Sequence, residues 1–398
     1  MKTVKFYTLG CKVNQYDTQS IRERFIQSGF KELSDGRPAS VYVINTCTVT
    51  HKADSESLGF IRKARRENPK ARIIVTGCLV EKDSACLFKI KEINLVISKR
   101  FFPDSISDFY GHTRAFLKIQ DGCNNFCSYC KVPLVRGKSR SRPLEDIIQE
   151  ASCLAKKGFK ELVLTGIDLG SYGKDLKQKI SLVDVIEALE RIEGLLRIRL
   201  SSIEAGDISN ELISKISESK KICRHLHIPI QSGDDKILRK MNRKYCRNDY
   251  LKLIKKLKKF VPGIAITTDC LVGFPGESEK NFTNTIDLLR KIAPLKAHIF
   301  PYSQRPGTLA SKFDGRIDTS IIKKRMLRLE KVSRSLALKY KRKFFNKHMD
   351  VLIEAKSKDK PGFWEGYTDN YIRVKVRSKR NLKNKLVSCI LTGQRISP

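Results

Sequence analysis

The sequence contains no apolar run near the ~20 residues that a membrane-spanning helix requires, which excludes a helical membrane protein. The apolar core at its N-terminus is too short for a secretory signal peptide, and this segment is predicted to form a strand. Internal repeats and low-complexity tracts are also missing. We therefore expect a soluble, cytoplasmic protein with no membrane partner.

Acidic residues are scarce. The chain has 42 Asp and Glu against 79 Lys and Arg, which gives a formal charge of +37. This excess is larger than solubility requires and favours a polyanionic partner, with nucleic acid as the leading candidate. A general lysine-rich bias of the proteome is the alternative, because net charge by itself defines no site.

Apolar residues are plentiful, at 40% of 398 residues, which excludes a wholly disordered chain and suits two to four domains. Over residues 1–110, short β-rich runs alternate with helical patterns. This alternation predicts a parallel sheet with helices on both faces. The expected strands are residues 4–9, 41–44, 72–76 and 94–98, and the expected helices are residues 14–30 and 55–66.

A second series of six βα units fills residues 111–335 and suits a full or partial barrel. The expected strands are residues 115–119, 162–165, 197–200, 226–230, 264–271 and 295–300, and the helices between them are residues 144–157, 182–192, 208–217, 248–259 and 279–291. After a basic helical stretch, short alternating strands predict a small all-β module over residues 336–398. The final segment, 321–398, holds 22 Lys and Arg against 6 Asp and Glu.

Twelve cysteines in a chain without an export signal indicate metal binding or redox chemistry rather than disulfides. Three of them, Cys123, Cys127 and Cys130, have C-x3-C-x2-C spacing; we call them the loop triad. Thiolates favour zinc, copper(I) or iron–sulfur clusters. A structural zinc site normally has four ligands, so three cysteines leave one position open for substrate or cofactor. Zinc with a distant fourth ligand such as His112 is the alternative.

Three further cysteines, Cys11, Cys47 and Cys78, each follow a predicted strand; we call them the strand-end triad. The ends of parallel strands gather at one edge of a sheet, so these side chains are expected to converge. Gly10 and Gly77 would let the backbone approach a bulky ligand closely. Each cysteine alone is more often a small buried hydrophobe, but three at equivalent positions favour a binding site.

With both triads in view, the chain resembles the methylthiotransferase family of radical S-adenosylmethionine (SAM) enzymes. The cysteine motif with Tyr129 before its last member is that superfamily's signature, and the family carries three further N-terminal cysteines like the strand-end triad. The C-terminal module resembles the family's RNA-binding TRAM domain, mainly over 366–376. Residues 10–15 and 48–50 are most similar to the branch that acts on N6-threonylcarbamoyladenosine in tRNA. Further matching segments are residues 8–14, 44–50, 227–233, 241–243 and 273–277.

The resemblance implies a flavodoxin-like N-terminal domain, a (β/α)6 partial barrel and a TRAM-like barrel. It implies two 4Fe–4S clusters, one on each triad, so that all six cysteines are both metal ligands and catalytic. The cluster on the loop triad would bind SAM and cleave it to a radical that abstracts hydrogen from C2 of adenine. The other cluster would present the sulfur, and a second SAM would supply the methyl group. The expected partners are a tRNA anticodon stem-loop and an electron donor such as flavodoxin or ferredoxin, with the enzyme a monomer.

The remaining SAM-pocket candidates lie at the ends of predicted barrel strands, where barrel chemistry collects. Thr165 and Gly166 occupy the position at which the superfamily contacts the amino group of SAM. Ordinary turn or capping chemistry is the alternative for each candidate. The full set is Tyr129, Thr165, Gly166, Ser201, Gln231 and Ser232.

A basic strip without any acidic residue follows the loop triad, and it favours contact with tRNA phosphates. Its members are Lys131, Arg136, Lys138, Arg140 and Arg142. A solvated loop is the alternative.

Three other functions remain open. Two share the chemistry and differ in substrate: isopentenyladenosine at the same tRNA position, or an aspartate of a ribosomal protein. The positive charge favours RNA over a protein substrate but does not separate the two adenosines. The third is a zinc- and RNA-binding protein without catalytic activity.

Overall fold

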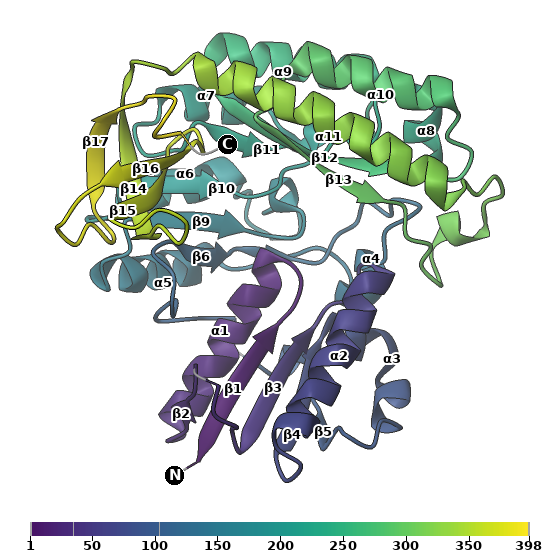
Figure 1. Ribbon diagram of the computed structural model, residues 1–398, viewed down its shortest axis with the longest axis vertical. Helices are drawn as coiled ribbons and strands as arrows, with labels where there is room; N and C mark the ends of the chain where they lie inside the picture. The colour runs from purple at the N-terminus through teal and green to yellow at the C-terminus, as the bar shows by residue number, and fades with distance from the viewer. Residues whose placement is uncertain (1, 35, 103, 397–398) are drawn as a thin grey trace.

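The N-terminal domain is a five-stranded parallel sheet with the strand order β2-β1-β3-β4-β5 (Figure 1). The structure is a computed structural model that describes residues 2–34, 36–102 and 104–396; for residues 83, 86 and 100 it describes the backbone alone. This flavodoxin-like order confirms the predicted fold. The strands are β1 (Thr3–Thr8), β2 (Lys31–Glu32), β3 (Val41–Thr46), β4 (Arg72–Gly77) and β5 (Leu95–Val96). The helices are α1 (Lys12–Gln27), α2 (His51–Glu67), α3 (Cys78–Phe88) and the short η1 (Lys99–Phe101).

Six parallel strands form the second domain as two three-stranded sheets, ordered β6-β9-β10 and β11-β12-β13. Two isolated bridges, Ile198 to Ile222 and Ser202 to His227, join these sheets between β10 and β11. The strands are β6 (Ala115–Lys118), β9 (Glu161–Thr165), β10 (Arg197–Leu200), β11 (His225–His227), β12 (Ala265–Val272) and β13 (Lys296–Pro301). Among the described residues, β6 and β13 do not pair, so the structure is a partial barrel with these two strands at its open side.

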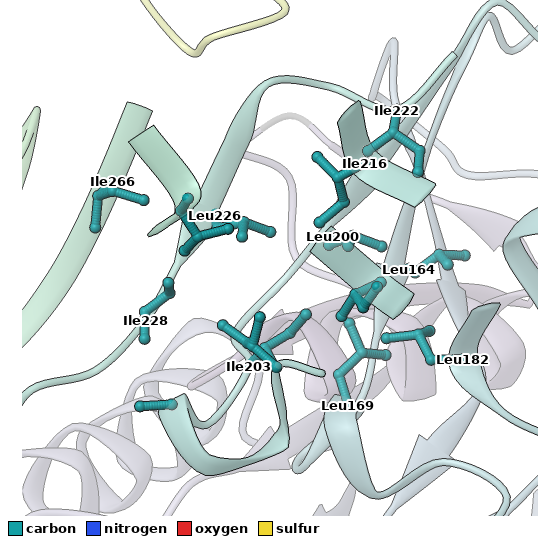
Figure 2. Close-up of a cluster of buried hydrophobic side chains, with 14 of the residues drawn as sticks. Leu164, Leu169, Leu182, Leu200, Ile203, Ile216, Ile222, Leu226, Ile228 and Ile266 are labelled. Atoms are coloured by element: carbon teal, nitrogen blue, oxygen red, sulfur yellow. The ribbon is translucent and has the colours of Figure 1, made fainter. Parts of the chain in front are cut away.

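Helices cover the outside of this barrel (Figure 1). They are α5 (Leu144–Lys156), α6 (Leu182–Glu190), α7 (Asn210–Glu218), α8 (Asp235–Lys240), α9 (Arg247–Phe260), α10 (Glu279–Ile292) and α11 (Thr319–Arg342). Four short helices lie in the loops: α4 (Val132–Arg136), η2 (Leu169–Ser171), η3 (Ala205–Asp207) and η4 (Leu309–Lys312). Figure 2 shows how aliphatic side chains such as Leu164, Leu200 and Ile216 fill the space between strands and helices. Burying such a side chain contributes about 1.5–3 kcal/mol, so this layer holds the strand ends in fixed positions.

The C-terminal module is a four-stranded antiparallel half-barrel, ordered β16-β15-β14-β17, which confirms the predicted TRAM-like fold. Its strands are β14 (His348–Lys356), β15 (Phe363–Thr368), β16 (Arg373–Arg377) and β17 (Leu386–Ile390). It packs on the amino end of the barrel: Arg197, the first residue of β10, donates hydrogen bonds to the carbonyls of Tyr367 and Asp350 at 3.0 and 2.7 Å.

Two local differences from the sequence-based prediction have physical causes. The expected strand 226–230 is cut to β11, because Pro229 lacks the N–H that a ladder requires. A small antiparallel pair, β7 (Gln120–Asp121) with β8 (Arg140–Ser141), was not predicted; its two strands have only two residues each, too few to show alternation. This pair brackets the loop triad and fixes both ends of its segment.

Among the described residues, no helix is long and apolar enough to cross a membrane.

Candidate active site

The loop triad lies in an irregular segment between β7 and α4. Neighbouring backbone groups hold this segment: the Ser128 N–H donates to the Met241 carbonyl, and the Asn242 side chain donates to the Phe126 carbonyl, both at 3.0 Å. Phe126 has a positive φ of 47°, which reverses the chain between the first two cysteines. The segment is therefore wrapped rather than extended, as its cysteine spacing predicts.

The three thiols of the loop triad lie in one electrostatic neighbourhood. Burial, with a smaller effect from the neighbouring thiols, raises the pKa of Cys123 to about 12 and that of Cys130 to about 11. The Arg243 guanidinium donates to the Cys127 sulfur at 3.4 Å and forms an ion pair with Glu204. A cation beside a sulfur ligand favours its thiolate form, which is the form that binds iron.

Two carboxyl groups border the same segment. Asp168 accepts a hydrogen bond from Asn125 at 2.9 Å, and its carboxylate oxygen lies 3.7 Å from the Cys123 sulfur. Burial raises the pKa of Asp168 to about 6, with Asp207 and Glu204 adding to the shift. A pocket of about 270 Å³ opens here between Asn124, Asp168 and Glu204.

The strand-end triad converges as the strand positions predict. Cys11, Cys47 and Cys78 follow β1, β3 and β4, and each thiol interacts electrostatically with the other two. Burial raises the pKa of Cys47 to about 11, whereas Cys11 is exposed to solvent. Asn14 links the three strand ends: its amide N–H groups donate to the carbonyls of Leu9 and Thr46 at 2.7 and 3.0 Å, and its side-chain oxygen accepts from the Cys78 thiol at 3.8 Å.

Both predicted glycines are required by the backbone at this edge. Gly10 and Gly77 have φ values of +94° and +97°, which L side chains rarely adopt. A Cβ on Gly10 would lie 3.0 Å from the Cys47 sulfur, and one on Gly77 would lie 2.3 Å from the Asn45 side-chain oxygen. These close approaches bring the cysteines together.

The structure does not support the zinc alternative with His112 as its fourth ligand. Among the described residues, no three His, Cys, Asp or Glu side chains are arranged to hold a single metal ion. The cysteines that hold a four-iron cluster each bind a different iron, so they need not surround a single ion. The proposed fourth zinc ligand, His112, instead packs on Phe109 and Phe116, with ring centroids 4.9 and 6.2 Å away. It precedes β6, at the opposite end of that strand from the loop triad.

The basic strip is the part of the prediction that the structure corrects. Arg136 is buried, pairs with Asp121 at 2.8 Å and with Asp17 at 3.6 Å, and donates to Asn14. Its charge also interacts with Cys11, Cys47 and Cys78. Arg136 therefore connects the helix after the loop triad to the strand-end triad and is not available to RNA phosphates.

Two other members of the strip are buried as well. Arg142 pairs with Glu150 at 2.9 Å, and Lys131 is enclosed so that burial lowers its pKa to about 8. Lys138 and Arg140 are exposed, and they line a pocket of about 450 Å³ that also contains Asp104. Only these two remain candidates for RNA contact.

Some of the SAM-pocket candidates lie at the ends of barrel strands as predicted, whereas Ser232 contacts a covering helix. Thr165, Ser201 and Gln231 do lie at or just after the ends of β9, β10 and β11. The Ser201 hydroxyl is buried without a hydrogen-bond partner among the described residues. A Cβ on Gly166 would lie 2.9 Å from the Gln120 side-chain oxygen, so a larger residue there would displace Gln120. Ser232 differs, because its hydroxyl lies 3.5 Å from that of Thr285 on α10 and accepts from the Asp234 N–H.

Tyr129 packs inward from the loop triad. Its hydroxyl lies 3.5 Å from Arg243, and its ring meets Phe274 edge to face at 6.4 Å. Sequence reasoning missed Asn14 and Asp168, which touch the triads. A polar residue one helical turn after Cys11 was a usable signal for Asn14, but nothing near Asp168 in sequence indicates its contact with Cys123.

Two family models match this chain. Residues 117–289 match the Radical SAM superfamily, and residues 3–98 match the family described as Uncharacterized protein family UPF0004. The first match covers the loop triad and the barrel from β6 into α10, and the second covers the strand-end triad.

Curated relatives match over almost the whole chain. The threonylcarbamoyladenosine tRNA methylthiotransferase MtaB of Bacillus subtilis is 38% identical, over 97% of this chain and 93% of the relative. MtaB of Thermotoga maritima is 35% identical, over 94% and 91%. The tRNA-2-methylthio-N(6)-dimethylallyladenosine synthase of Lachnoclostridium phytofermentans is 34% identical, over 98% and 93%.

Solved structures share the fold. The radical SAM methyltransferase TsrM of Kitasatospora setae superimposes with a TM-score of 0.56 at 13% identity, over 78% of this chain and 77% of that one. The cobalamin-dependent SAM radical enzyme OxsB gives 0.52 at 11% identity, over 84% and 56%. With its barrel, its two cysteine triads and full-length relatives at 34–38% identity, the chain belongs to the radical SAM methylthiotransferase family.

Proposed function

We propose that this protein methylthiolates C2 of N6-threonylcarbamoyladenosine next to the anticodon of tRNA. The observation that carries this proposal is the similarity of 35–40% over nearly the full chain to several relatives named for that reaction. The pairing of two cysteine triads across one domain boundary supports it, because sulfur insertion needs both a radical source and a sulfur donor.

The family implies a 4Fe–4S cluster and SAM, and we propose that the loop triad holds this cluster and the strand-end triad a second one. When bound, these groups supply the radical, the sulfur and the methyl group. The chain's own residues orient them: Arg243 donates to Cys127, Asn14 ties together the strand ends, and Arg136 neutralises charge beside the strand-end triad.

Water exclusion is the second task of the protein. The barrel helices and the N-terminal sheet bury Cys47 and Cys78, and they half-bury the loop triad. A dry site protects a reactive radical from side reactions. Cys11 remains exposed and marks the side from which a substrate enters.

The substrate alternatives are weighed by charge and similarity. The formal charge of +37 supports an RNA substrate over a ribosomal protein. A relative at 34% identity is named for dimethylallyladenosine, so N6-dimethylallyladenosine is the second candidate.

Nucleoside analysis tests the proposal. tRNA from a strain lacking this gene is digested to nucleosides and compared with wild type by mass spectrometry. We expect selective loss of 2-methylthio-N6-threonylcarbamoyladenosine with accumulation of its precursor. Loss of the 2-methylthio-dimethylallyl nucleoside instead would move the protein to the second candidate, and an unchanged profile would refute both.

A further inference from the structure

Lys12 is a cation without a partner in the site. It is the first residue of α1 and directly follows Cys11. Its side chain makes no hydrogen bond or ion pair with any described residue, and it is exposed to solvent. The N-terminal edge of α1 thus presents an ammonium group beside a cysteine of the strand-end triad.

Electrostatic neighbours place this ammonium at the open side of the barrel. Lys12 interacts with Arg114, which precedes β6, and with His298 on β13, so both edge strands of the partial barrel are near it. It also interacts with the buried Arg199 and His225 inside the barrel. Lys12 is thus surrounded by groups of the barrel, and part of its side chain remains exposed to solvent.

The other charged groups of this region already have partners. Arg199 pairs with Glu161 at 2.6 Å, and Arg114 pairs with Glu161 at 3.6 Å. His227 lies 3.2 Å from Asp269. Among the cations near the strand-end triad, Lys12 directly follows Cys11 and, in the part of the chain that the structure describes, has no acidic partner, so it can receive an anion from outside the chain.

The two candidate adenosines differ in this respect. The threonylcarbamoyl group carries a carboxylate, whereas the dimethylallyl group has no polar atom. An incoming carboxylate would replace the water that Lys12 loses with a charge-assisted hydrogen bond. An incoming dimethylallyl group would displace water from the ammonium without forming a hydrogen bond to it. This uncompensated desolvation would disfavour binding of the dimethylallyl substrate.

We propose that Lys12 is a specificity-determining residue that binds the carboxylate of the threonylcarbamoyl group on the substrate adenosine. This inference rests on the proposed function and adds the residue that distinguishes the two substrates. The residue attracts the correct side chain by charge and disfavours the apolar one by desolvation.

Binding measurements on the anaerobic holoenzyme test the inference. Three anticodon stem-loops are compared: one with N6-threonylcarbamoyladenosine, one with its neutral carboxamide and one with unmodified adenosine. The variant Lys12→Met should lose about tenfold or more of the affinity for the carboxylate form and leave the other two affinities unchanged. Lys12→Arg should retain most of the preference.

Lys70→Met is the matched control. Lys70 is also exposed, but it lies before β4, at the far end of the sheet from the cysteines. Its loss removes the same charge and should not change the preference for the carboxylate. Thermal unfolding of each variant checks that the fold is intact.

Other roles for Lys12 would give different results for the Lys12→Met variant. Equal weakening of all three stem-loops would assign Lys12 to an RNA phosphate, and a raised KM for SAM would assign it to the SAM carboxylate; either result overturns the inference. An unchanged preference in Lys12→Met also overturns it. If the wild-type enzyme neither prefers nor methylthiolates the carboxylate form, the proposed function itself has failed.

Discussion

Two cysteine variants separate the roles proposed for the triads. Cys127→Ala removes one ligand of the loop triad and should abolish SAM cleavage, measured as 5′-deoxyadenosine. Cys47→Ala, in the strand-end triad, should retain SAM cleavage but form no methylthio product. The wild-type protein should be brown and hold about eight iron atoms, and each variant about four. If Cys47→Ala still forms the methylthio product, the two-cluster mechanism is wrong.

Two arginines from one basic strip should behave in opposite ways. Arg136→Met leaves Asp121 with a weakened set of cations in the interior and should lower the free energy of unfolding by about 3 kcal/mol in urea titrations. Arg140→Met removes an exposed charge and should leave stability unchanged, while the slope of log K for tRNA against log salt falls by about one. A stable Arg136→Met protein with weakened RNA binding would restore the original interpretation of the strip.

The ion pairs of the basic strip could not be predicted from the sequence around it. No acidic residue lies among its members, so a solvated or RNA-binding surface is the natural prediction. The partners of Arg136 come from elsewhere in the chain: Asp17 lies on α1 and Asp121 on β7. The pair with Asp17 depends on how the N-terminal domain meets the barrel, and no local pattern encodes it.

At the scale of elements, the turn before α3 sets the position of Cys78. Gly77→Ala should cost about 3 kcal/mol, because the residue has a positive φ and its new Cβ would meet Asn45 and the Thr46 backbone. Iron retained by the strand-end triad should fall with it. Gly59→Ala is the control, since Gly59 lies within α2 with open space around it and should gain about 0.5–1 kcal/mol. Equal effects of the two substitutions would contradict this account.

Elements with strong periodicity were predictable, and so was the meeting of the strand-end triad. Cys11, Cys47 and Cys78 are far apart in sequence, but each follows a strand of one parallel sheet. Because the ends of parallel strands lie at the same edge of a sheet, the three cysteines meet there. Short elements such as β7 and β8 escaped prediction because two residues carry no period. The orientation of Ser232 toward α10 was not predicted either, since a hydroxyl after a strand can face the barrel interior or a covering helix.

At the scale of the molecule, a stack of rings joins the C-terminal module to the barrel. Tyr371 stacks on His225 with centroids 4.5 Å apart, and the Arg199 guanidinium lies 4.7 Å from its ring. Tyr371→Ala should lower the unfolding free energy by about 2–3 kcal/mol and expose the connection after α11 to protease. Tyr371→Phe keeps the ring and should resist cleavage like the wild type; sensitivity equal to that of Tyr371→Ala would refute the stacking argument.

The module and the loop triad lie at opposite ends of the barrel. The barrel strands have three to eight residues, about 10–26 Å of extended chain. A ligand in contact with both ends must extend at least that far along the outer wall, which a single nucleoside does not. The separation of the two ends therefore sets a minimum length for an efficient RNA substrate. Turnover should rise sharply once the RNA fragment is long enough to contact the distant module while its modified base enters the barrel.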